Sequence, residues 1–161
     1  MDYLWTPWRY QYVTKLAGTV NCIFCAVAAD LEHDPEHLVV HRAARNLVIL
    51  NRYPYTSGHL MVAPYEHTAT LEDLPDDTLV ELIRLGRLAE KHLRAIYQPD
   101  GLNLGFNIGR SAGAGIAGHV HLHALPRWVG DVSFMTSVGE TRVLPEDLGT
   151  TWEKLRRAFS E

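Results

Sequence analysis

Three histidines spaced two residues apart are the part of this sequence with the clearest chemical meaning. His119, His121 and His123 alternate with apolar residues through position 124. Residues two apart share a face of a β-strand, so the pattern predicts a strand with three imidazoles on one face. We expect Pro126 to end this strand or to confine it to a sheet edge. Such imidazoles could bind a metal, transfer protons, or attack phosphorus as nucleophiles.

The segment before the histidines is rich in small residues. Positions 107–118 contain four glycines and three alanines. Backbone N–H groups in such a loop are unshielded and can approach a ligand closely. A glycine-rich loop followed by a row of imidazoles predicts a phosphate held beside a reactive histidine or a metal.

Composition restricts the class of protein. The 161 residues, 47% hydrophobic and 21% charged, suit a single globular domain. A net charge of -4 without a Lys/Arg run argues against a nucleic-acid partner. We expect no membrane partner, since no apolar run approaches the roughly 20 residues that span a bilayer. Residues 1–5 have no basic or apolar signal-peptide pattern, so a cytoplasmic location is expected.

The two cysteines, Cys22 and Cys25, are separated by two residues. Without a signal peptide, metal binding or redox chemistry is favoured over a disulfide. A redox pair normally sits at a helix N-terminus after a strand, and no convincing pattern of that kind follows Cys25. Two thiolates with two imidazoles would make a closed tetrahedral zinc site.

The hydrophobic pattern predicts an α+β fold, an antiparallel meander with helices on one face. We expect a short apolar run at 38–40 and strands at 46–50, at 59–63 (stopped by Pro64) and at 102–107, besides the histidine strand. The strands at 46–50 and 59–63 should be antiparallel neighbours. A long helix is expected from Pro75, near N1, to Tyr97, and a short amphipathic helix in 144–159 beginning at Pro145. Segments 30–37 and 128–141 are interpreted as irregular.

The N-terminal residues 1–20 form a predicted aromatic arm. Its aromatic residues are Tyr3, Trp5, Trp8, Tyr10 and Tyr12. We expect this arm to pack on the body or on a second subunit; the alternative is a platform on which a base stacks.

The sequence resembles the histidine-triad (HIT) nucleotide hydrolases and transferases. Residues 119–125 match the His-x-His-x-His-x-x signature, with x apolar, and 47–62 resembles the family's strand, ribose-binding position, connector and Gly-His strand. The resemblance covers roughly residues 20–135. Segments 5–9 and 126–134 look like the branch of bacterial diadenosine tetraphosphate phosphorylase-like proteins. The resemblance to the family implies a HIT-like sheet of about five strands in one domain, with a core at 21–135 and a C-terminal segment at 136–161.

The resemblance also implies roles for individual residues. His121 would be the nucleophile, and His123 would contact the phosphate and help to protonate the leaving group. Asn51 would bind the ribose and Asn107 a phosphate or bridging oxygen, although either could instead be a turn residue. The implied phosphate donors are the N–H groups of Gly113, Ala114, Gly115 and Ile116. The loop lacks the hydroxyl or amide side chain that many relatives carry before the first histidine, so only backbone donors remain. His59 and Trp128 complete the predicted substrate site.

In zinc-bearing members of the family, the metal ligands match Cys22, Cys25, His67 and His119. The resemblance thus implies a structural zinc with no open coordination position. His33, His37 and His41 are alternative third ligands. His59 is expected to orient the site rather than to bind the metal.

The function implied is cleavage of dinucleoside polyphosphates through a nucleoside monophosphate–histidine intermediate, with phosphate as the acceptor. Alternatives are a nucleoside phosphoramidase or AMP-releasing hydrolase, a nucleotide-binding module with little turnover, and a metallohydrolase with all three histidines on one metal. The expected ligand is a purine nucleotide, with adenine as the expected base. A homodimer formed by the long helix and an adjoining strand edge is expected.

Overall fold

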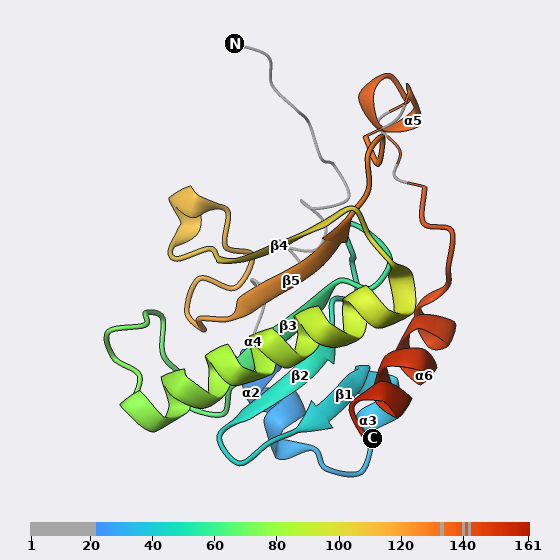
Figure 1. Ribbon diagram of the computed structural model, residues 1–161. Coiled ribbons are helices and arrows are strands. Elements are labelled where there is room, and N and C mark those ends of the chain that lie inside the picture. Colours follow the sequence, from blue (N-terminus) through green and yellow to red (C-terminus); the bar gives the residue numbers. More distant parts are fainter. Residues whose placement is uncertain (1–21, 133, 140, 142) are drawn as a thin grey trace.

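The computed structural model describes residues 22–132, 134–139, 141 and 143–161 (Figure 1). The aromatic arm predicted at residues 1–20 lies outside the described residues.

A five-stranded antiparallel sheet forms the centre of the fold (Figure 1). Its strands are β1 (Val39–Arg42), β2 (Asn46–Leu50), β3 (Leu60–Pro64), β4 (Gly101–Phe106) and β5 (Leu122–Arg127). The antiparallel pairing predicted for β2 and β3 is confirmed. The order β1-β2-β3-β5-β4 departs from a simple meander, because β5 lies between β3 and β4. The strand that carries the last histidine is therefore internal to the sheet.

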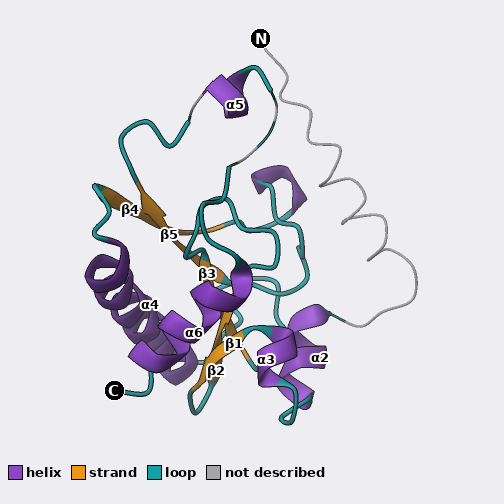
Figure 2. Cartoon of the chain, turned by 90° about the vertical axis from the view of Figure 1, so that its right-hand side faces the viewer, coloured by secondary structure: helices purple, strands orange, loops and turns teal. Residues whose placement is uncertain are grey.

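Helices cover both faces of this sheet (Figure 2). The long α4 (Asp76–Tyr97) and the C-terminal α6 (Leu148–Ala158) pack on one face, and α2 (Ile23–Ala29) packs on the other. Three further elements are short helical turns: α3 (Asp34–His37), α5 (Phe134–Ser137) and the 3-10 helix η1 (Arg110–Ala112). The expectation that all helices share one face is wrong, because α2 brings Phe24 and Val27 to the second face. Within the described residues, no helix is long and apolar enough to cross a membrane.

The strand β2 shows why two helical layers are needed. All of its five residues are buried. Val48 and Leu50 pack in the core that includes α4, whereas Leu47 and Ile49 pack with Phe24 of α2. A strand covered on both faces tends to be a continuous apolar run rather than alternating, which is how the sequence reads after Asn46.

Several predicted boundaries shift by local hydrogen bonding. Pro75 is the N-cap of α4 rather than its first residue, and Gln98, in the left-handed conformation at φ 45, follows the last turn. The C-terminal helix begins at Leu148 instead of Pro145, because the Asp147 side chain accepts from the N–H of Thr150 and caps it. Pro64 belongs to β3 rather than stopping it. The segments interpreted as irregular contain α3 and α5.

Candidate functional site

The three histidines come from one continuous segment, of which only the end is a strand. The predicted strand start at His119 is wrong, since β5 begins at Leu122. The N–H of Val120 donates instead to the carbonyl of Thr68, at 2.7 Å. The alternation of side chains still holds, because Val120 and Leu122 belong to the core that includes α4. The prediction that Pro126 ends this strand or confines it to a sheet edge is wrong, because β5 runs to Arg127 and lies between β3 and β4. Pro126 itself pairs with β4 only, beyond the last residue that pairs with β3, so its missing N–H interrupts no bond to β3.

Two cysteines and two histidines from distant segments form a cluster. The potential ligand atoms of Cys22, Cys25, His67 and His119 all lie within 4.8 Å of one another. The Sγ of Cys22 is 3.1 Å from Nδ1 of His119, and the Sγ of Cys25 is 3.2 Å from Nδ1 of His67. Tetrahedral zinc with about 2.3 Å to sulfur and about 2.0–2.1 Å to nitrogen separates its ligand atoms by about 3.4–3.8 Å. The cluster therefore fits a zinc ion after small adjustments.

The tautomer of His119 supports this fit. Its Nε2 lies 2.9 Å from the carbonyl oxygen of Pro64, which can only accept, so Nε2 carries the hydrogen. The lone pair of Nδ1 consequently faces the two sulfurs. A ligand histidine that donates its other ring N–H to a carbonyl is a common arrangement in metal sites. Burial raises the pKa of the Cys22 thiol and so disfavours the thiolate. Coordination of the thiolate to a metal would offset this cost.

The alternative third ligands do not join this cluster. His33 and His37 both contact the carboxylate of Asp30, at 2.9 and 3.0 Å. That contact holds the pKa of Asp30 far below its usual range. His41 packs against Phe159 of the C-terminal segment, with ring centroids 5.7 Å apart.

His121 has the opposite ring nitrogen available. Its Nδ1 lies 2.8 Å from the carbonyl oxygen of His119, so Nδ1 carries the hydrogen and Nε2 carries the lone pair. The side chain is 5% exposed, and burial lowers its pKa, opposed by the hydrogen bond to His119. A neutral imidazole with a free Nε2 is the form that acts as a nucleophile.

Phe24 positions two of the histidines and was missed by the sequence analysis. Its ring centroid lies 5.1 Å from that of His119 and 4.8 Å from that of His121. It comes from the first turn of α2, directly between the two cysteines. The helix after Cys22 escaped prediction because Ile23–Ala29 has no polar face and no side-chain cap.

His59 and His123 form a hydrogen-bonded pair. Nε2 of His59 lies 2.9 Å from Nδ1 of His123. The backbone N–H of Tyr55 donates to Nδ1 of His59 at 3.2 Å, which makes Nδ1 an acceptor and places the hydrogen on Nε2. That hydrogen points to Nδ1 of His123, so neutral His123 carries its own hydrogen on Nε2. The arrangement gives His123 a defined N–H donor.

The predicted binding residues lie in different parts of the site. Asn51 follows β2; its Oδ1 accepts from the N–H of Tyr53, as in a turn, while its Nδ2 lies 3.3 Å from Nδ1 of His59. Asn107 follows β4 at the start of the glycine-rich loop. Trp128 follows β5, with its ring 6.4 Å from that of Tyr97.

The glycine-rich loop is closed by the pairing of Phe106 with Leu122 at its two ends. Gly113 donates its N–H to the carbonyl of Arg110, and Ala114 donates to Gly109. Among the described residues, the N–H groups of Gly115 and Ile116 have no hydrogen-bond partner. Of the four predicted phosphate donors, these two are therefore the ones whose N–H groups are not used within the loop.

Comparisons with known proteins agree with this geometry. Residues 33–129 match the family model described as the HIT domain. An AP-4-A phosphorylase from Mycobacterium tuberculosis is 38% identical over 92% of this chain and 79% of the relative. The adenosine 5'-monophosphoramidase hnt1 of Schizosaccharomyces pombe is 28% identical over 81% of this chain and 98% of the relative.

A solved structure gives the same result at the level of the fold. A zinc-bound histidine triad family protein from Mycobacterium smegmatis superposes with a TM-score of 0.70 and 31% identity. The match covers 87% of this chain and 94% of the other. The expected five-stranded sheet, long helix and C-terminal helix are confirmed. By its motif, its fold and these relatives, the chain belongs to the HIT family of nucleotide hydrolases and transferases.

Proposed function

We propose that this protein cleaves dinucleoside polyphosphates such as diadenosine tetraphosphate through a nucleotidyl intermediate on His121. The observation that carries the proposal is the hydrogen bond from Nδ1 of His121 to the carbonyl of His119, which leaves Nε2 unprotonated. The buried position favours the neutral, nucleophilic ring.

The proposed reaction has two steps. In the first, Nε2 of His121 forms a bond to the α-phosphorus, and the bond from that phosphorus to its bridging oxygen breaks. ATP leaves from diadenosine tetraphosphate, assisted by the N–H that His59 fixes on His123. In the second step, inorganic phosphate attacks the same phosphorus, the N–P bond breaks, and ADP is released. Water as the acceptor would release AMP instead. The identity of 38% with an AP-4-A phosphorylase supports phosphate as acceptor.

The remaining predicted residues would bind the substrate. The N–H groups of Gly115 and Ile116 would contact the α-phosphate, with Gly113 and Ala114 shaping the loop. Donors fixed where charge develops are worth about 3–4 kcal/mol each. Asn51 would contact the ribose and Asn107 a phosphate oxygen. An adenine base is the proposed preference.

Cys22, Cys25, His67 and His119 would hold a structural zinc ion. Such an ion would crosslink the N-terminal end of α2, the segment after β3 and the start of the histidine row. All four ligands come from the protein, and His119 is held besides by Pro64. His121 would remain free for nucleotide chemistry.

The test combines an adduct and an acceptor experiment. Protein quenched with diadenosine tetraphosphate should show a mass increase of one nucleoside monophosphate on His121, and His121→Ala should show none while still binding the nucleotide. Adding phosphate should accelerate turnover and change the product from AMP to ADP. His92→Ala, a histidine on α4 outside the site, is the matched control. An adduct on another residue would overturn the assignment, and indifference to phosphate would reduce it to a hydrolase.

A nucleoside phosphoramidase is the second candidate. The fixed N–H of His123 favours it, because an amine leaving group needs a proton more than a polyphosphate does. The similarity to the adenosine 5'-monophosphoramidase of S. pombe points the same way. Comparing kcat/KM for adenosine 5'-phosphoramidate and diadenosine tetraphosphate distinguishes the two activities.

We also propose a homodimer formed by the β4 edge and α4. Within the described residues, β4 pairs with β5 alone, and three of its six residues are exposed. Leu104 on β4 and Ile83 on α4 are large exposed hydrophobic residues. The two elements adjoin, since a Cβ on Gly86 of α4 would lie 3.8 Å from Leu104. An open strand edge beside apolar side chains suits pairing with a second copy.

A further inference from the structure

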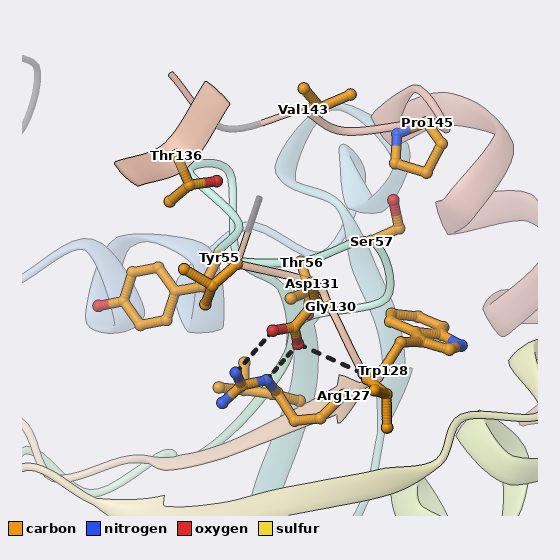
Figure 3. A pocket seen from close by; sticks show the side chains of 13 residues that line it. Tyr55, Thr56, Ser57, Arg127, Trp128, Gly130, Asp131, Thr136, Val143 and Pro145 are labelled. Atoms are coloured by element: carbon orange, nitrogen blue, oxygen red, sulfur yellow. Dashed lines mark hydrogen bonds and ion pairs between the residues drawn. The ribbon is translucent and has the colours of Figure 1, made fainter. Parts of the chain in front are cut away.

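A pocket lies beyond the histidines, between the connector that precedes β3 and the segment that follows β5 (Figure 3). Its volume is about 600 Å³. Small-molecule sites commonly have volumes of about 300–1,000 Å³. Of the residues given a role above, only Trp128 and Tyr55, whose backbone N–H donates to His59, line it.

Two aromatic rings form walls of this pocket (Figure 3). Tyr55 also stacks on His123, with centroids 6.3 Å apart and an angle of 23° between the rings. The pocket and the proposed proton donor therefore share one wall. Trp128 contributes another wall and packs its edge on Tyr97. Aromatic walls of this kind suit a flat heteroaromatic ring.

A buried hydroxyl in the same pocket has no partner. Ser57 is 7% exposed, and its Oγ makes no hydrogen bond within the described part of the chain. Buried polar groups are nearly always satisfied, so an unpaired one on a pocket wall is a group that a ligand or a water would satisfy. A ring nitrogen, an amino group or a ribose hydroxyl could supply that bond.

The charges around the pocket favour an uncharged ligand group. Arg127 is paired with Asp131, with Nη2 2.8 Å from Oδ1. Asp131 also accepts from the backbone N–H of Trp128 at 3.3 Å (Figure 3). The guanidinium is thus already neutralised, and the carboxylate holds Trp128 in place before any ligand arrives. Among the described residues, the preorganised walls thus carry no net charge, which suits a base or ribose better than a phosphate.

We propose that this pocket binds the second nucleoside of a dinucleoside polyphosphate, the half that leaves when His121 is nucleotidylated. The inference rests on the function proposed above, because it takes the phosphate chain to start at His121. From there the chain would pass His123 and lead the distal nucleoside past Tyr55. The preferred substrate class is then one with two nucleosides rather than one.

The test compares two ligands with the same phosphate chain. Diadenosine tetraphosphate carries two nucleosides and adenosine tetraphosphate carries one. Dissociation constants are measured in full-length protein carrying His121→Ala, so that no turnover occurs and the result does not depend on catalysis. Added substitutions are Ser57→Ala and Trp128→Leu. Val138→Ala, an exposed apolar residue that does not line the pocket, is the control.

We expect diadenosine tetraphosphate to bind more tightly than adenosine tetraphosphate. Trp128→Leu should weaken the former by roughly 5-fold to 150-fold, the range of one base–aromatic stack. Ser57→Ala should weaken it by roughly 2-fold to 10-fold, as for one hydrogen bond. Adenosine tetraphosphate and the control variant should show no change. Equal losses for both ligands, or no loss for either, would overturn the pocket assignment. A missing adduct on His121 in the wild type, with these binding differences intact, would overturn the catalytic proposal alone. Ser57→Ala, which removes only an unpaired hydroxyl, decides the matter if Trp128→Leu fails to fold.

Discussion

Replacing His59 tests whether the orientation of His123 matters for turnover. His59 is fully buried and donates from Nε2 to Nδ1 of His123, 2.9 Å away. In His59→Phe, a ring of similar shape remains but the donor is lost. His123 can then place its hydrogen on Nδ1 and present a lone pair where the leaving group needs a proton.

The size of the effect follows from one hydrogen bond in a buried place. Losing a partner there costs about 1–3 kcal/mol, which corresponds to roughly 5-fold to 150-fold in kcat. His59→Gln should retain more activity than His59→Phe, because the amide nitrogen of glutamine can take the place of Nε2. The loss should be larger for adenosine 5'-phosphoramidate than for an adenylyl ester with an acidic phenol, since the phenol leaves without a proton.

Steady-state kinetics with both substrates checks this, and thermal unfolding of each variant checks that the fold is kept. If His59 acts through His123, its loss should affect the two substrates unequally. A purely structural role of His59 would instead lower activity on both substrates equally. An equal loss, or wild-type activity in His59→Phe, would refute the reasoning.

Three further predictions concern the rest of the molecule. The Cys25→Ser variant should contain about one zinc less per chain by elemental analysis. Its Tm should fall by at least about 5 °C, as expected for the loss of a few kcal/mol of stability in a domain of this size. Turnover should persist at temperatures where the variant is folded, and its abolition there would indicate a catalytic metal. Burial lowers the pKa of His41 and of His92, and both rings pack on Phe159. Below about pH 6.5 the unfolded chain therefore binds protons that the native state does not, so stability should be full above that pH and fall below it. A His41→Gln, His92→Gln double variant should flatten this dependence of Tm on pH. An unchanged slope would show that these two histidines do not cause the pH dependence. Ile83→Glu should shift the protein to monomers in sedimentation experiments, with Glu90→Gln on the same helix as control; a wild-type monomer would exclude the proposed dimer.

Much of the fold could be predicted because its patterns are strong and local. The apolar run of β2 and the helical period of α4 place both elements to within about a residue. The exchange of β4 and β5 in the sheet could not be read from the same patterns, because it depends on which strand edges meet. The start of β5 was missed for a related reason: the period of two continues through His119, but Val120 bonds to Thr68 instead of β3.

The site divides in the same way. The metal cluster was implied by a family resemblance, and the potential ligand atoms of its four residues lie within 4.8 Å of one another. Phe24 and Ser57 were not found, since neither residue type signals a role and each acts only through neighbours far along the chain. Phe24 touches rings about a hundred positions later, and Ser57 matters because its hydroxyl meets no partner in the described part of the chain.

The three histidines differ only because of what each ring contacts. The carbonyl of Pro64 fixes the hydrogen of His119 on Nε2 and turns Nδ1 toward the cysteines. The carbonyl of His119 fixes the hydrogen of His121 on Nδ1 and leaves Nε2 free. A backbone carbonyl at one ring nitrogen thus decides which nitrogen keeps its lone pair, Nδ1 in His119 and Nε2 in His121. His123 instead meets another imidazole, whose own state is set by the N–H of Tyr55. Exchanging the proposed roles of His119 and His121 would require moving backbone carbonyls, so the main chain fixes the order of the proposed functions along the segment.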